Sequence, residues 1–137
     1  QELADKFSTI MKAELTNKKY LIAETVDFIE KNYQNYNFHI VSGSDEKELN
    51  YLCKELGISN YFKTIEGSPT AKNDLVRNII KIYNYDFKDC ILIGDSINDY
   101  EVANVNTMKF YGYNNAKLKK FDGYIESFME ITKENIF

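Results

Sequence analysis

Three clusters of polar residues follow apolar runs in the sequence, and their side chains suit the binding of a phosphate group and a cation. Ser42-Gly43-Ser44 offers hydroxyl groups and backbone amides at the start of an expected helix, a position where phosphates bind. Lys72 also stands at the start of an expected helix, where a cation is unfavourable unless an anion compensates it. Asp95 and Asp99 follow the clearest apolar run, and carboxylates so placed suit a hard cation such as Mg2+.

Each cluster also has an interpretation that needs no ligand. A Ser-Gly turn with Asp45 as the helix cap accounts for the first cluster. Lys72 can be a solvated surface lysine, and Asp95 and Asp99 can simply cap the following helix. Residue types alone therefore leave both interpretations open at each position.

The apolar spacing predicts the elements that must position these residues. Periods of three and four residues indicate helices, and short continuous apolar runs indicate strands buried on both faces. The expected helices cover residues 1–15, 21–33, 45–56, 71–85 and 99–104, with a last helix after residue 125. The expected strands cover residues 38–41, 61–66, 90–93, 108–111 and 124–125.

Alternation of strands and helices predicts an α/β fold with a parallel sheet that is covered by helices on both faces. In such sheets the ligand site lies beyond the carboxyl ends of the strands. The three polar clusters all follow expected strands, so we expect them to meet at one edge of the sheet.

The order of the clusters resembles the second, third and fourth motifs of the haloacid dehalogenase-like (HAD) superfamily over about residues 18–131. The motifs are Ser42 at a strand end, Lys72 after Gly67-Ser68-Pro69, and Gly94-Asp95-Ser96-Ile97-Asn98-Asp99. The resemblance implies a three-layer, Rossmann-like (Rossmannoid) core with a helical cap.

The same resemblance implies a role for each site residue. Ser42, Gly43 and Lys72 would bind the phosphoryl group, and Lys72 would also act in catalysis by neutralising charge. Asp95 would bind Mg2+. Asp99 would be a second catalytic residue that supports the metal or orients Asp95 and Lys72.

The sequence departs from the family at its first motif, a strand that ends in Asp-x-Asp and carries the nucleophile. Asp5 and Asp27 precede Ser42, and neither has an aspartate two positions on. We therefore expect residues 1–17 to be the end of a helical cap, residues 18–137 to be an incomplete core, and the nucleophile strand to be missing from the chain, which starts inside the cap.

A missing central strand would expose backbone groups of its two neighbours. We expect those neighbours to close up, another chain to fill the gap through self-association, or the chain to be a fragment of a folded parent protein.

The resemblance implies that the parent protein is a Mg2+-dependent phosphohydrolase. It would act on a small phosphorylated metabolite through an aspartyl-phosphate intermediate, and this chain alone would be inactive. One alternative is a phosphomutase of the same family, and another is a non-catalytic regulatory or interaction module. The α/β pattern is also shared by receiver and flavodoxin-like domains, but the order of the motifs does not fit them. In this family the cap largely sets substrate specificity, and we expect most of it to lie outside the chain.

Composition excludes several other classes of protein. The net charge of −4 and a pI near 5.1, with no concentrated basic segment, argue against a nucleic-acid partner. No apolar run is long enough to span a membrane, and we expect a cytoplasmic protein. Cys53 and Cys90 are expected to be reduced packing residues, and His39, the only histidine, is expected to be packed in a strand.

Overall fold

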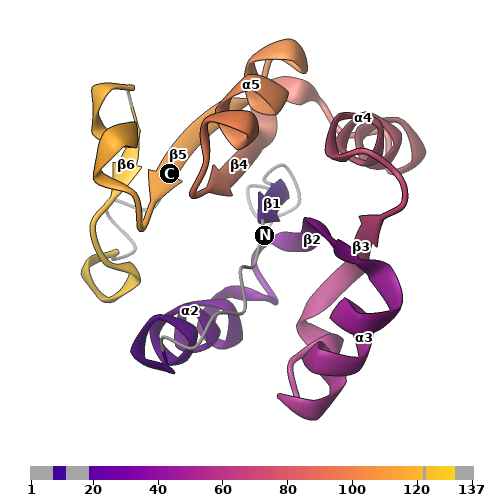
Figure 1. Cartoon of the computed structure of the whole chain (residues 1–137), viewed down its shortest axis with the longest axis vertical. Helices are drawn as coiled ribbons and strands as arrows, with labels where there is room; N and C mark the ends of the chain where they lie inside the picture. The colour runs from indigo at the N-terminus through magenta and orange to yellow at the C-terminus, as the bar shows by residue number, and fades with distance from the viewer. Residues whose placement is uncertain (1–7, 12–18, 122, 132–137) are drawn as a thin grey trace.

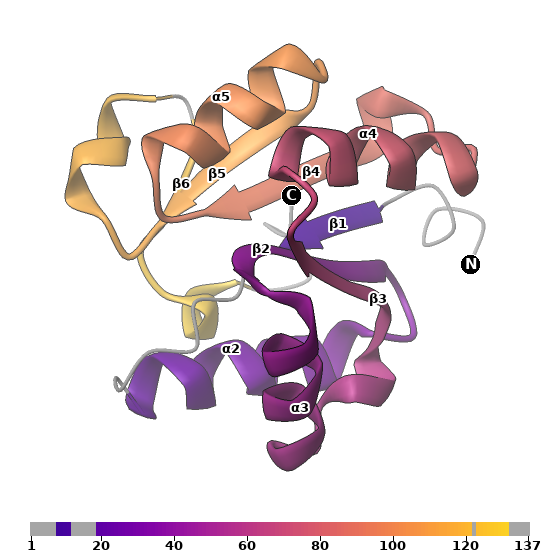
Figure 2. The ribbon, with the colours of Figure 1, turned by 45° about the vertical axis from the view of Figure 1, so that its right-hand side comes forward.

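The computed structural model describes residues 8–11, 19–121 and 123–131 of the 137-residue chain. Within these residues six parallel strands form one sheet in the order β3-β2-β1-β4-β5-β6. Helices α2 and α3 cover one face of the sheet, and α4 and α5 cover the other (Figure 2). The predicted three-layer α/β architecture is confirmed.

The described elements follow in chain order. They are β1 (Ser8–Met11), α2 (Lys19–Asn32), β2 (Asn37–Asp45), α3 (Glu46–Glu55), β3 (Phe62–Ser68), α4 (Lys72–Ile82), β4 (Cys90–Gly94), α5 (Ile97–Val105), β5 (Lys109–Tyr113) and β6 (Tyr124–Ile125), with short 3-10 turns η1 (Ser59–Tyr61), η2 (Phe87–Asp89), η3 (Ala116–Lys120) and η4 (Phe128–Glu130) between or after them.

The sheet is buried on both faces, which explains its continuous apolar strands. Along β4 every residue is buried, and the side chains alternate between the two cores. Ile91 and Ile93 pack with α2 and α3, whereas Cys90 and Leu92 pack with α4 and α5. β4 therefore contacts both layers of helices, and Asp95 comes directly after its last residue.

The helix predicted over residues 1–15 is wrong at Ser8–Met11, which form strand β1. Figure 1 shows β1 in the middle of the sheet, and it pairs in parallel with both β2 and β4. The reason is that backbone groups between two buried strands must be paired, a demand that outweighs a local helical period. Two β-branched residues, Thr9 and Ile10, suit a strand.

β1 fills the position that we expected to be empty, so β2 and β4 do not close up on each other. Each has a strand on both sides, which removes the exposed strands on which the expected self-association depended. Strand β1 is not followed by Asp-x-Asp in the sequence. The predicted boundary between cap and core at residue 17 stays a prediction, because residues 1–7 and 12–18 lie outside the described part.

Two further predictions need correction or fall outside the description. β2 extends through Ser42-Gly43-Ser44, which we expected to form a loop, although its pairing with β3 is irregular between Val41 and Asp45. After β6 the described chain forms only the short turn η4, and the rest of the expected last helix lies outside the described residues.

His39 is a packed strand histidine, as predicted. It is fully buried in β2, and its two ring nitrogens lie 2.7 Å from Thr64 Oγ1 and 2.8 Å from Tyr85 Oη. Burial and the nearby Lys63 lower the pKa of His39 to about 4, so the ring is neutral at pH 7. Both ring nitrogens are therefore within hydrogen-bond distance of a neighbouring hydroxyl group.

Candidate functional site

Ser42 and Asp95 lie at the same height on either side of β1. Ile40 of β2 and Ile93 of β4 are both register partners of Met11, and Ser42 and Asp95 come two residues later on their strands. Neighbouring strands are about 4.8 Å apart, so the two residues are separated by about 10 Å. Strand order reverses here, which makes this edge the position where open α/β sheets bind ligands.

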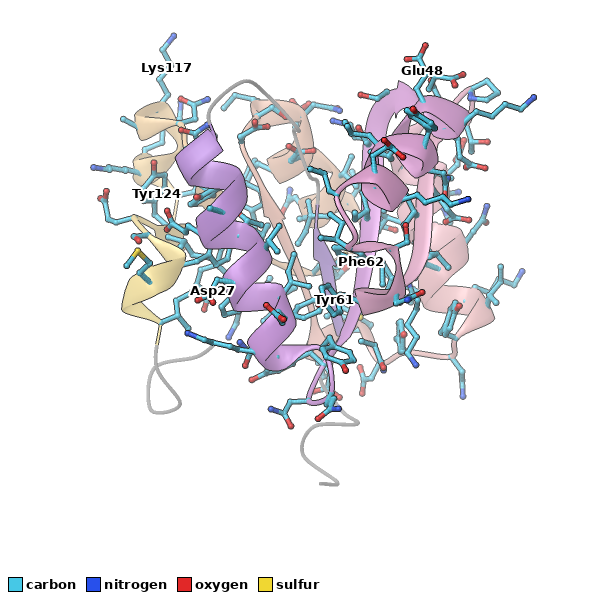
Figure 3. All side chains as sticks on the ribbon, turned by 90° about the horizontal axis from the view of Figure 1, so that it is seen from below. Asp27, Glu48, Tyr61, Phe62, Lys117 and Tyr124 are labelled. Carbon is cyan, nitrogen blue, oxygen red and sulfur yellow. The ribbon has the colours of Figure 1, made fainter. Side chains whose placement is uncertain are left out.

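Figure 3 shows the orientation of this edge. Glu48, in the first turns of α3, and Lys117, in η3, project at the end of the molecule where β2 and β5 terminate. Tyr61 and Phe62, at the start of β3, lie toward the opposite end. The candidate site therefore lies at the same end as Glu48 and Lys117.

Lys72 and Asp99 form an ion pair at this edge. Lys72 Nζ donates to Asp99 Oδ1 at 3.2 Å, and only 13% of the Lys72 side chain and 2% of the Asp99 side chain are exposed. Lys72 is the first residue of α4, where the helix dipole disfavours a cation. Asp99 is thus the compensating anion that the sequence pattern requires, and it belongs to the same chain.

Gly94 and Ser96 fix the position of Asp99. A Cβ atom on Gly94 would lie 2.5 Å from both Cβ and Oδ2 of Asp99, so only glycine allows this approach. Ser96 caps α5 by accepting the Asp99 N–H at 3.1 Å, and its hydroxyl donates to Asp99 Oδ2 at 2.9 Å. The helix cap predicted as an alternative role for the aspartates is provided by Ser96, while Asp99 faces Lys72.

Gly43 lies beside this pair, and Ser42 precedes it on β2. Ser42 is buried, and its Oγ accepts the Ser44 N–H at 3.1 Å, which leaves the hydroxyl proton for another acceptor. A Cβ atom on Gly43 would stand 3.6 Å from Cε of Lys72, so the lysine side chain runs along the backbone of the β2 end. The structure therefore brings Gly43, Lys72 and Asp99 into one cluster with Ser42 on the same strand end.

Asp95 lies on the other side of β1, half-buried after β4. Its carboxylate is an oxygen donor of the kind that Mg2+ selects. Among the described residues no group of three or more His, Cys, Asp or Glu side chains could hold a metal ion. Mg2+ keeps several waters and binds through one or two carboxylates together with substrate phosphate, so Asp95 fits this ion and does not form a complete cage.

Several residues that connect these loops were missed in the sequence. Glu46 Oε1 accepts the Gly67 N–H at 3.1 Å and joins the end of β3 to the start of α3. Asn115 Nδ2 donates to the main-chain oxygen of Asp95 at 3.0 Å. The Ser96-x-x-Asp99 spacing was a detectable capping signal, whereas the reach of Asn115 and Glu46 depends on tertiary structure and has no local signal.

One further hydrogen bond connects the two helices that carry Lys72 and Asp99. Asn106 Nδ2 donates to Asn73 Oδ1 at 2.8 Å, which ties the first turn of α4 to the end of α5. The helix that carries Lys72 is therefore joined to the helix that carries Asp99.

The end of β3 carries a carboxyl group with a shifted pKa. Burial and the neighbouring Glu46 raise the pKa of Glu66.

Comparison with known proteins agrees with this architecture. The model of the haloacid dehalogenase-like hydrolase family matches residues 1–113, so the chain belongs to that family. Among curated proteins, none matches the sequence significantly. In the part of the chain that the structure describes, no helix is both long and apolar enough to cross a membrane.

Solved structures show the same fold at low sequence identity. A haloacid dehalogenase-like hydrolase from Streptococcus pneumoniae is 23% identical with a TM-score of 0.67, covering 74% of this chain and 53% of its own. CbbY from Rhodobacter sphaeroides, solved with phosphate, is 16% identical with a TM-score of 0.65, covering 78% and 54%. The chain thus spans about half the length of these proteins.

A third structure contains a core domain alone. The core domain of a protein assigned as a phosphoglycolate phosphatase from Streptococcus pneumoniae is 15% identical with a TM-score of 0.63, and the match covers 88% of both chains. The chain thus has the same fold as this domain over most of its length.

Proposed function

We propose that this chain supplies the phosphate-binding and Mg2+-binding loops of a phosphohydrolase that acts on a small phosphorylated metabolite. The buried Lys72–Asp99 pair next to Gly43 at the end of β2, in a member of a hydrolase family, is the observation that carries the proposal. A lysine held by a buried carboxylate at a site otherwise rich in donors is arranged to offset the charge of a phosphoryl group.

Each residue has a separate task in this proposal. Ser42 donates its hydroxyl proton to a phosphoryl oxygen, and the ammonium group of Lys72 neutralises charge on the same group. Asp99 keeps Lys72 extended toward the site. Asp95 would bind Mg2+, which when present offsets negative charge on the phosphate oxygens. Phosphoryl transfer depends mainly on such positioning and charge compensation.

The covalent step requires an aspartate that residues 1–137 do not offer in an Asp-x-Asp pair. We propose that an aspartyl nucleophile outside this chain takes the phosphoryl group as the substrate's alcohol leaves, and that water then cleaves the aspartyl phosphate to release inorganic phosphate. Residues 1–137 alone would bind phosphate without hydrolysing a substrate.

The test is Mg2+-dependent hydrolysis of small phosphate esters by the intact protein, meaning the parent protein that also contains the proposed nucleophile. Asp95→Asn is expected to abolish turnover, whereas Asp89→Asn, the same change just before β4 rather than after it, should leave it unchanged. Turnover retained by Asp95→Asn would overturn the assignment of the metal site.

A second function, that of a non-catalytic phosphate-binding module, is favoured by one observation. The central strand position belongs to Ser8–Met11, and Lys12-Ala13-Glu14 follows it in place of Asp-x-Asp. An intact protein that binds inorganic phosphate through Lys72 but hydrolyses no phosphate ester would establish this second function instead of the first.

A further inference from the structure

Asn115 makes three hydrogen bonds, one of which joins the loop after β5 to the loop after β4. Its Nδ2 donates to the main-chain oxygen of Asp95 at 3.0 Å, and its Oδ1 accepts the Lys117 N–H at 3.1 Å. Its own N–H donates to Tyr124 Oη at 3.2 Å. The amide side chain therefore has its nitrogen on the loop after β4 and its oxygen on its own loop.

The two ends of this side chain do different work. The oxygen caps η3 and stabilises that turn in the way that an N-cap residue does. The nitrogen holds the peptide that follows Asp95, between the end of β4 at Gly94 and the cap of α5 at Ser96. The Asp95 side chain extends from the Cα atom next to this peptide, so a bond that fixes the peptide also helps to fix the direction of the carboxylate.

We infer that Asn115 is a positioning residue that presents the Asp95 carboxylate to Mg2+ through its hydrogen bond to the Asp95 main-chain oxygen. The inference rests on the proposed function, in which Asp95 binds the ion. Groups that hold a metal ligand in place set the affinity for the metal even though they do not touch it. Asn115 thus acts on the ion without being a ligand.

The substitution Asn115→Ser separates the two roles. Serine is a good N-cap and can keep accepting the Lys117 N–H, but its side chain is too short to donate to the Asp95 oxygen. The matched control is Asn60→Ser, the same change at an exposed position in η1, at the other end of the molecule near Tyr61 (Figure 3).

The experiment is a titration of the intact protein with Mg2+ alone. Binding is measured by calorimetry and by changes in the NMR amide signals of residues 95 and 96. Asn115→Ser is expected to weaken Mg2+ binding roughly tenfold, and Asn60→Ser to leave it unchanged. Without Mg2+, the melting temperature of Asn115→Ser should stay within about 3 °C of the parent because the cap persists.

Each contrary result has a separate meaning. Mg2+ affinity equal to that of the parent in Asn115→Ser would overturn the inference while leaving the metal site intact. A large loss of thermal stability in Asn115→Ser would also overturn it, since the two roles would then be inseparable. Mg2+ binding that Asp95→Asn does not weaken would instead remove the proposed metal site, and the positioning role with it.

Discussion

Removing the charge of Lys72 should destabilise the protein because its partner is the more deeply buried member of the pair. Asp99 has 2% of its side chain exposed and lies 3.2 Å from the lysine, whereas Lys72 retains 13% exposure at the site. In Lys72→Met the carboxylate would keep the Ser96 hydroxyl but lose its cation. The reverse change, Asp99→Asn, would leave a lysine that can turn toward water.

The distance and burial set the size of the effect. At 3.2 Å and an effective dielectric constant of about 20, two unit charges attract by about 5 kcal/mol. Desolvation offsets part of this attraction, and removal of one partner from a buried pair costs about 3–5 kcal/mol. Because Lys72 is partly exposed, we expect about 3 kcal/mol for Lys72→Met, which corresponds to a loss of about 10 °C in melting temperature, and less for Asp99→Asn.

The assay is urea unfolding of Lys72→Met, Asp99→Asn and the double variant at pH 7. The double variant should be more stable than Lys72→Met alone, because it no longer buries a carboxylate that has lost the Lys72 ammonium group. Equal stability of these two variants, or a coupling energy below about 0.5 kcal/mol, would refute the reasoning and show that the pair is effectively solvated.

Three further predictions concern buried groups near and far from the site. Burial holds the pKa of His39 at about 4, below the 6.5 of the unfolded chain, so the unfolded state takes up the proton first as pH falls. Unfolding free energy should drop by about 3 kcal/mol between pH 6.5 and 4, and His39→Gln should flatten this slope in urea titrations. Gly94→Ala should cost about 2 kcal/mol by displacing the aspartate beside it, whereas Gly43→Ala, with an ordinary 3.6 Å contact, should cost less by the same measurement. Burial raises the pKa of Cys53 to about 11 and of Cys90 to about 12, so neither thiol should react with a disulfide reagent at pH 8 until the protein unfolds; rapid reaction of the folded protein would contradict their burial.

Buried strands and the residues just after them were predictable from the sequence. The run at 90–93 is apolar throughout because β4 lies between two layers of helices, and Asp95 follows its end as expected. Lys72 at a helix start indicated that an anion must compensate its charge. Only the structure shows that this anion is Asp99, 27 residues away. Local patterns therefore predicted the positions of Asp95 and Lys72 at the ends of their elements, but they could not predict which residues form a pair.

Long-range pairing explains what was predicted wrongly. Residues 8–11 belong to a segment with helical spacing, yet they form the central strand because β2 and β4 each need a partner there. The sequence Ser42-Gly43-Ser44 is typical of a turn, yet in the structure it continues β2 alongside the end of β3. The link from Asn115 to Asp95 spans 20 residues and has no periodic signal.

The central claim is that one edge of this sheet binds phosphate together with Mg2+. Calorimetric titration of the intact protein with inorganic phosphate, with and without Mg2+, tests it most directly. We predict binding that Mg2+ strengthens, that Lys72→Met weakens at least tenfold, since a lost charge-assisted contact is worth about 1.5–3 kcal/mol, and that no longer responds to Mg2+ in Asp95→Asn. Phosphate binding that neither substitution changes would contradict the account.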